Sequence, residues 1–143
     1  MTELTAVALN AAATTPLHHL KVTSSYGFEE TLQRLRQAIN DADLWVIHEI
    51  DPQALLRRGG FAVTSLRQLL WFHPRFMTRL LLADPGAVPE VPLKFVVSAE
   101  PTVVAVRALN PVLVFSPYAE LVAMADELLD VTHRMLTSVC TER

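Results

Sequence analysis

The stretch that decides the fold covers residues 69–97 and reads LLWFHPRFMTRLLLADPGAVPEVPLKFVV. Residues 69–72 predict the end of a buried strand, and Pro74 suits the first position of a helix because its φ is already helical. A turn of aspartate, proline and glycine at 84–86 ends that helix, and two more prolines stiffen the connection to an apolar strand at 93–98. A strand, a short helix and a second strand therefore form the expected centre of the domain.

An amphipathic helix is predicted upstream, over residues 28–42. Gly27 stands at its cap position, and two glutamates place negative charge in the first turn, where the helix dipole favours it. One apolar stripe recurs at intervals of four and three residues and consists of Phe28, Leu32, Leu35, Ile39 and Ala42. Alternating residues predict a weak strand at 17–25 before this helix and a stronger strand at 44–50 after it.

Asp51 and Pro52 predict a short second helix, because a capping aspartate precedes a proline at the first helical position. A loop then leads to the strand at 66–72. Further along the chain, the apolar segments at 93–98 and 102–108 predict an antiparallel hairpin.

The last predicted helix begins at Ser116 and Pro117, again a cap residue followed by proline. Its apolar face consists of Leu121, Ala125, Leu128, Thr132, Met135 and Val139, widened by Val122, Leu129 and Leu136. At about 1.5 Å per residue, such a helix would be about 35 Å long. The element order is strand, helix, strand, strand, helix, strand, strand, helix. This order is typical of an α+β fold with an antiparallel or mixed sheet covered by helices.

The composition indicates one globular domain. The chain has 143 residues, of which 51% are apolar and 19% charged. Such an apolar surplus is expected where a second subunit covers part of the surface, although a well-filled core gives it too; a homodimer is one prediction from it. The net charge of -3 and the pI near 5.9 argue against a nucleic-acid partner. The single cysteine, Cys140, excludes an internal disulfide and an all-thiolate metal site.

The first 16 residues are expected to form a flexible N-terminal arm, and residues 17–143 the domain itself. The arm has an alanine-rich centre but neither a basic start nor a sustained apolar core, which a signal peptide would need. No run in the chain reaches the roughly 18 apolar residues of a membrane span. We therefore expect a cytoplasmic protein with no membrane partner.

Several segments, taken in order, resemble the family known as domain of unknown function 302 (DUF302). They are Ser24-Ser25, Phe28-Glu29-Glu30-Thr31, Ile47-His48-Glu49-Ile50-Asp51, Phe72-His73-Pro74 and Pro92-Leu93-Lys94-Phe95-Val96-Val97. The resemblance covers roughly residues 20–106. It implies a compact α+β domain of the TATA-binding-protein-like class, with the order β-α-β-β-α-β-β-α and with members that form dimers. It implies no assigned biochemical function.

The chain departs from the family pattern at several positions. Phe72 and Leu93 stand where branches of the family have cysteine, so thiol chemistry is not expected there. His73 replaces the usual asparagine, and residues 99–101 replace a glycine-rich turn. No catalytic residue is therefore carried over from the resemblance.

The one local arrangement with chemical potential is His73-Pro74-Arg75, with Arg79 one turn further along the predicted helix. Backbone N–H groups at the helix start and two arginines could bind a small anion such as phosphate or carboxylate. His73 would then titrate near neutral pH beside the anion. The simpler interpretation is that His73 caps the helix and Arg75 points to water.

A metal or haem site is a minority hypothesis centred on His73. If the strands at 44–50 and 66–72 pair as antiparallel neighbours, His48 is expected opposite a residue near Gln68 and about 16 Å from His73. That separation is too large for one metal ion. Met77, four residues after His73, could complete a haem ligand pair, but a core position is favoured for it. No cofactor is required by the sequence.

Glu49 and Asp51 alternate on one face of their predicted strand and could form a general acid/base pair, although Asp51 is better explained as a helix cap. The favoured hypothesis is a homodimeric domain without catalytic activity that binds a small ligand, with a small anion as one candidate, or a protein partner. The alternative is an enzyme, or a haem, metal or anion binder, with its site at His73, Arg75 and Arg79. The candidate ligand-binding residues are His73, Arg75, Arg79, His48 and Asp51.

Overall fold

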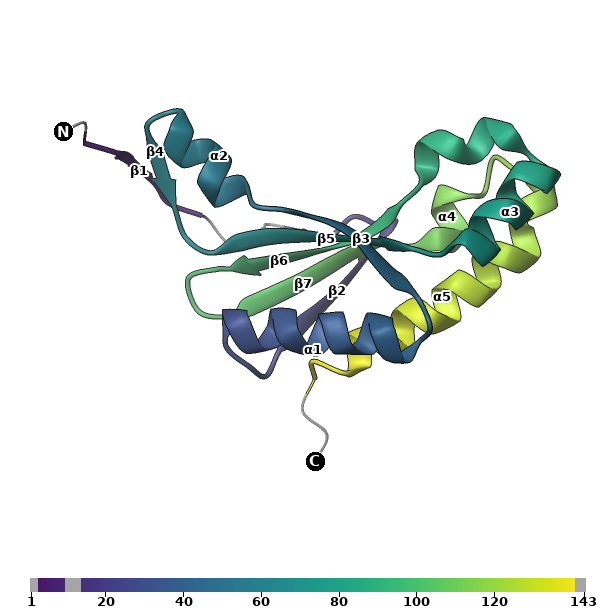
Figure 1. The fold of residues 1–143 in the computed structure, drawn as a ribbon. Coiled ribbons are helices and arrows are strands. Elements are labelled where there is room, and N and C mark those ends of the chain that lie inside the picture. The colour runs from purple at the N-terminus through teal and green to yellow at the C-terminus, as the bar shows by residue number, and fades with distance from the viewer. Residues whose placement is uncertain (1–2, 10–13, 141–143) are drawn as a thin grey trace.

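Five strands form one antiparallel sheet, in the order β2-β7-β6-β5-β3 (Figure 1). The structure is a computed structural model and describes residues 3–9 and 14–140. The strands are β2 (His19–Ser24), β3 (Trp45–Ile50), β5 (Leu66–Phe72), β6 (Leu93–Ala99) and β7 (Val104–Leu109). All neighbouring strands are antiparallel, and β6 and β7 form the predicted hairpin. The α+β class is confirmed.

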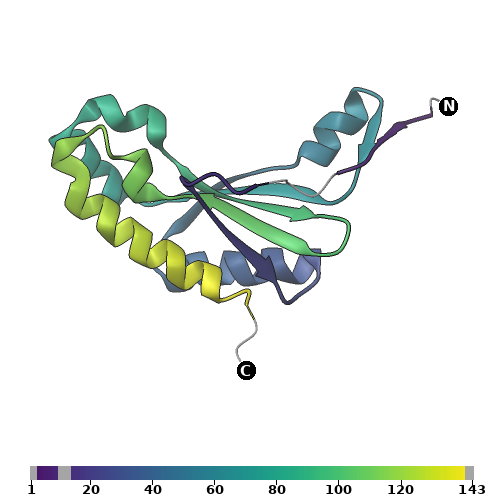
Figure 2. The ribbon, with the colours of Figure 1, turned by 180° about the vertical axis from the view of Figure 1, so that it is seen from behind.

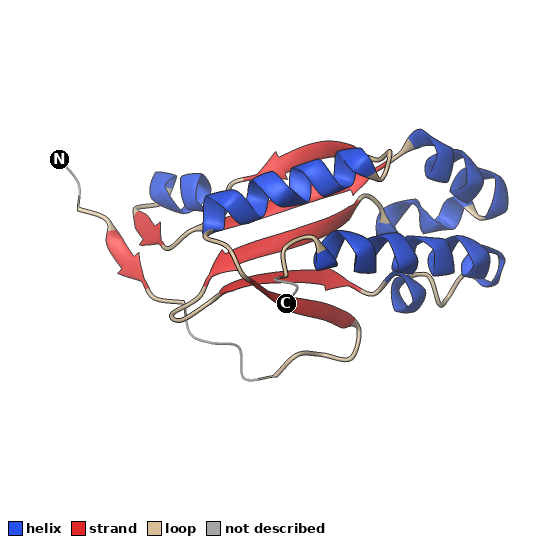
Figure 3. Ribbon diagram, turned by 90° about the horizontal axis from the view of Figure 1, so that it is seen from below, coloured by secondary structure: helices blue, strands red, loops and turns tan. Residues whose placement is uncertain are grey.

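Two long helices, α1 (Phe28–Asp41) and α5 (Val122–Thr137), lie on the same face of the sheet (Figure 3). At one end of the molecule lie the shorter elements α3 (Pro74–Ala83), η1 (Pro85–Glu90), α4 (Pro111–Val114) and η2 (Ala119–Leu121). In the described part of the chain, no helix lies across the middle of the opposite face. None of the described helices is long and apolar enough to cross a membrane.

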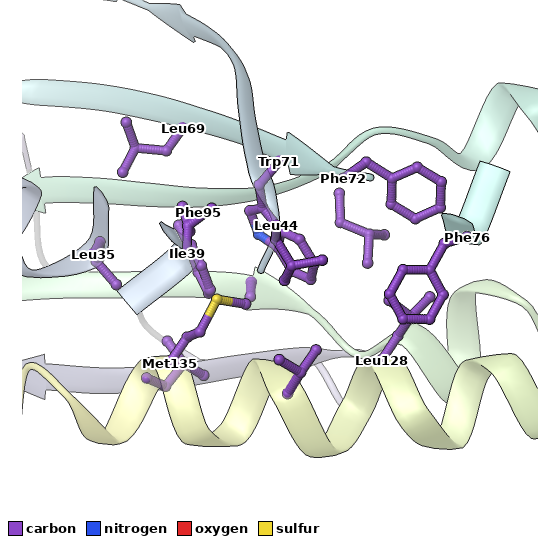
Figure 4. Packing of buried hydrophobic residues seen from close by; sticks show 14 of the residues in the cluster. Leu35, Ile39, Leu44, Leu69, Trp71, Phe72, Phe76, Phe95, Leu128 and Met135 are labelled. Atoms are coloured by element: carbon purple, nitrogen blue, oxygen red, sulfur yellow. The ribbon is translucent and has the colours of Figure 1, made fainter. Parts of the chain in front are cut away.

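The core lies between the sheet and these two helices (Figure 4). The predicted stripe of α1 is confirmed, because Leu32, Leu35 and Ile39 are fully buried. On the sheet, the rings of Trp71 and Phe95 stack with their centroids 5.6 Å apart. Seen from behind (Figure 2), α5 ends beside β2, the edge strand of the sheet, and there the Ser25 amide donates to the Val139 carbonyl at 2.9 Å.

Three short elements stand away from this body and are called the projecting arm (Figure 1). They are β1 (Thr5–Val7), α2 (Pro52–Arg58) and β4 (Phe61–Val63), and β1 pairs with β4 in parallel. Of these, the sequence predicted only α2; β1 falls within the segment that was expected to be a loose N-terminal arm. Every residue of α2 is described, and none of them is buried.

The predicted start of the last helix at Ser116 and Pro117 is wrong. The Ser116 hydroxyl instead donates to the Leu113 carbonyl at 2.8 Å, at the end of α4. The 3-10 turn η2 then redirects the chain, and α5 begins only at Val122, so its 16 residues span about 24 Å instead of 35 Å. Val122 was expected on the buried face, but at this first position it is 59% exposed.

The predicted pairing of His48 is also wrong, by two residues. His48 lies opposite Leu70, and Gln68 lies opposite Ile50. The connection between the two strands contains α2 and β4 and is therefore not a simple symmetric loop. As a result, His48 pairs with a residue two positions further along β5 than predicted. A register shift between Val46 and His48 adds a further irregularity.

Candidate functional site

His73 is the N-cap of α3, as the simpler interpretation predicted. Its Nδ1 accepts a hydrogen bond from the Arg75 amide at 3.0 Å, and its carbonyl accepts from the amides of Phe76 and Met77. The N–H groups in the first turn of α3, which could bind an anion at a helix start, therefore already have partners within the chain. An anion at this helix start would have to displace these bonds.

The two arginines of α3 also have partners in neighbouring elements. Arg75 donates to the carbonyls of Asp43 and Ala42 and forms an ion pair with the Asp43 carboxylate at 3.5 Å, so it does not simply point to water. Arg79 makes a two-pronged contact with Glu127 of α5, with Nη1 3.0 Å from Oε1. The hydrogen bonds from Arg79 lower the pKa of Glu127. Each arginine thus ties α3 to another part of the chain.

The cap also selects one tautomer of the neutral His73 ring. A neutral imidazole has one donor and one acceptor nitrogen, and here Nδ1 accepts. The proton therefore lies on Nε2, which in this tautomer can donate a hydrogen bond but has no lone pair for a metal or haem iron. No cluster of three metal-ligating side chains occurs among the residues that the structure describes.

Beside His73 lies an apolar surface on the edge of the sheet. Among the described strands, β3 has a neighbour on one side only. Its side chains Trp45, Val46 and Ile47 are 55%, 37% and 48% exposed. Trp45 and Ile47 line a cavity of about 280 Å³ whose walls also include His73, Met77 and Pro92, and the ring of Trp45 meets that of His73 edge-on at 5.0 Å. We call these three exposed side chains and the cavity the apolar edge surface.

The two acids of the predicted pair, Glu49 and Asp51, both form ion pairs with arginines. Glu49 accepts two hydrogen bonds from Arg36, at 2.7 and 2.8 Å, and these bonds lower its pKa. Arg67 lies 3.7 Å from Glu49 and 3.6 Å from Asp51. Asp51 also caps α2 through the Ala54 amide at 3.1 Å, as predicted. Glu49 is therefore held as a carboxylate and is a poor general acid.

The predicted site residues do not converge. His48 is exposed opposite Leu70, and His73 follows Leu70 by three residues, about 10 Å along the strand. Asp51 belongs to the start of α2, and Arg79 to an ion pair with α5. Of the five candidates, only His73 lines the cavity of the apolar edge surface.

Several basic side chains lie together on the face of the sheet opposite α1 and α5. The sequence pattern did not predict this cluster. Register places Lys21 opposite Arg107 and Arg107 opposite Val96, while Lys94 lies one row further, next to Leu109. His19 lies opposite Leu109. Each residue comes from an ordinary alternating strand, so only the register of three strands brings them together.

An antiparallel sheet with its long helices on one face defines a small two-layer α+β domain. The sequence model of the family described as domain of unknown function DUF302 matches residues 20–139, and the chain belongs to this family. Its fold is similar to that of the crystal structure of an uncharacterized conserved DUF302 protein from Bacillus stearothermophilus, with a TM-score of 0.81 and 20% identity, covering 87% of this chain and 99% of that one. No curated protein matches the chain.

Proposed function

We propose that this chain is a homodimeric binding domain without a catalytic step, whose two copies join along the apolar edge surface. The observation that carries the proposal is the exposure of Trp45, Val46 and Ile47 on β3, which has a described neighbour on one side only. An edge strand with exposed apolar side chains offers both unpaired backbone groups and a hydrophobic contact to another chain. In a monomer, this apolar surface and the unpaired backbone groups would both remain exposed to water, which is unfavourable.

The opposite edge of the same sheet supports this choice of surface. The edge strand β2 exposes Lys21 and Thr23, and a lysine on an edge strand disfavours pairing with another sheet. The two edges thus differ in the way expected when one faces water and the other a partner. Because a two-fold contact places the same patch of each copy together, an apolar patch suits a second copy of the chain.

The alternative site at His73, Arg75 and Arg79 would require these side chains to leave their present partners. Two of them hold α3 to other elements, and the third caps it. A dimer at the apolar edge surface needs no such rearrangement. The side chains that line the cavity also offer a second copy a recess for an apolar group.

The test compares the mass of wild-type protein and of two variants by light scattering coupled to size-exclusion chromatography, over a dilution series. Ile47→Glu places a charge at the centre of the proposed contact. Val122→Glu is the matched control, because Val122 is 59% exposed and lies at the start of α5, away from β3. Circular dichroism checks that both variants keep the fold.

Wild type and Val122→Glu should have the mass of a dimer at high concentration, and Ile47→Glu that of a monomer. A folded wild-type protein that is a monomer at all concentrations would refute the dimer. A folded Ile47→Glu variant that dimerises as strongly as wild type would refute this interface. If Ile47→Glu does not fold, the milder Ile47→Ser variant takes its place under the same criteria.

A further inference from the structure

The face of the sheet opposite α1 and α5 has a one-sided charge. In the described strands that form this face, the charged residues whose side chains point outward are all basic, namely Lys21, Lys94 and Arg107. This occurs in a chain whose net charge is -3. A local surplus of positive charge on an acidic chain attracts anions. We call these residues, together with His19, the basic face.

One acid does reach this face, from the turn after β6. Glu100 accepts a hydrogen bond from Arg107 and lies 3.1 Å from the Ser98 hydroxyl. The bond from Arg107 lowers the pKa of Glu100, which keeps it ionised. Glu100 thus pairs with Nη1 of Arg107 and offsets one positive charge, so the basic face keeps a net positive charge from its lysines and arginine.

Two donors on the basic face are free to receive an acceptor. The Nη2 atom of Arg107 is buried and has no hydrogen-bond partner among the described residues, a state that costs about 1–3 kcal/mol. Lys94 is exposed, and its ammonium reaches only the distant Gln68 amide oxygen at 3.5 Å. Lys94 and Arg107 line the same cavity, so one carboxylate placed there is a candidate acceptor for both side chains.

Apolar side chains lie beside these donors. A shallow cavity of about 280 Å³ is lined by His19, Lys94 and Arg107 and by the apolar side chains of Val96 and Leu109. Phosphate alone would leave this apolar lining in water. An anion that carries an apolar body would cover it, at a gain of about 25 cal/mol for each Å² buried.

We propose that the basic face binds a small organic carboxylate with an apolar body. Lys94 and Arg107 hold the carboxylate, and the body rests on Val96 and Leu109. None of these residues belongs to β3 or to the apolar edge surface. The site is therefore independent of the proposed dimer, and the monomeric Ile47→Glu variant should retain it.

The experiment titrates ¹⁵N-labelled protein with octanoate and follows the amide resonances by NMR. Octan-1-ol serves as the uncharged probe with the same apolar body. Lys94→Gln removes one positive charge from the basic face, and Arg57→Gln removes one from the exposed surface of α2 as the matched control. Each measurement is repeated with Ile47→Glu, so that loss of the dimer and loss of the site are distinguished.

Octanoate should shift amides of β2, β6 and β7 and bind at least about tenfold more tightly than octan-1-ol. Lys94→Gln should weaken octanoate binding about tenfold, while Arg57→Gln leaves it within about twofold. Equal binding of both probes, or equal effects of both variants, would overturn the proposal. So would binding to phosphatidylserine vesicles without octanoate binding, since it would assign the basic face to a membrane surface.

Discussion

At the scale of single residues, the charged side chains act mainly as links between elements. Arg36 joins α1 to β3 through Glu49, and Arg79 joins α3 to α5 through Glu127. The first contact is only partly buried and the second is exposed, so each is expected to add modestly to stability. Residue patterns such as His73-Pro74-Arg75 therefore predicted a helix cap correctly but did not show which acids from distant elements would pair with the arginines.

The Glu49 carboxylate should make stability depend on pH. Hydrogen bonds from Arg36 lower the pKa of Glu49 below its ordinary value of 4.5. A carboxyl whose pKa is lower in the folded state stabilises the fold above its unfolded pKa, and this contribution is lost as pH falls through the folded value. We expect urea unfolding to show falling stability below about pH 4.5. Glu100 and Glu127, whose pKa values are lowered in the same way, contribute to the fall.

Glu49→Gln should lower the free energy of unfolding at pH 7 by about 1 kcal/mol and make the loss below pH 4.5 shallower. The matched control is Glu30→Gln, which removes an exposed ion pair within α1 and should cost less than about 0.5 kcal/mol. If both variants followed the wild-type pH profile, Glu49 would have no part in the acid sensitivity.

The His73 cap yields a second prediction at this scale. His73→Ala removes the acceptor of the Arg75 amide and should cost about 1 kcal/mol, measured by urea unfolding. His73→Asn supplies another capping side chain and should restore stability to within a few tenths of a kcal/mol. Equal losses in both variants would show that the ring contact with Trp45, and not the cap, provides the stability.

At the scale of elements, the sequence predicted a helix or strand correctly where its pattern of apolar residues was long and regular. The stripe of α1 and the alternation of β6 and β7 repeat often enough to identify those elements. The cap-and-proline pattern was ambiguous, because Asn110-Pro111 and Ser116-Pro117 both carry it and only the first begins a helix. The three-residue strands β1 and β4 give no period, and their partner lies far away in the sequence.

The projecting arm should be the least protected element in the isolated chain. A seven-residue helix and a two-stranded sheet are marginal on their own, and no residue of α2, β1 or β4, which are all described, is buried. In hydrogen exchange of monomeric Ile47→Glu, amides of the arm should exchange in the earliest time points, while those of β6 remain protected. Protection of α2 as strong as that of β6 would contradict this expectation.

At the scale of the whole molecule, the sheet has one covered face and two unlike edges. Its open face is basic, one edge is polar, and the other edge is apolar. The sequence alone could predict the sheet but not these surfaces, because they depend on which strands lie outermost and on register. Lys94 and Arg107 become neighbours only through the pairing of β6 with β7. Trp45 becomes an edge residue only because no described strand pairs with the outer side of β3.

The most direct test of the proposed dimer is iodide quenching of tryptophan emission across a range of protein concentrations. The chain has two tryptophans, of which Trp71 is 1% exposed and Trp45 is 55% exposed. Iodide should therefore report on Trp45, which belongs to the apolar edge surface. Quenching should fall as concentration rises and the mass approaches that of a dimer, and it should stay high in Ile47→Glu. Unchanged quenching while the mass doubles would mean that the two copies join elsewhere.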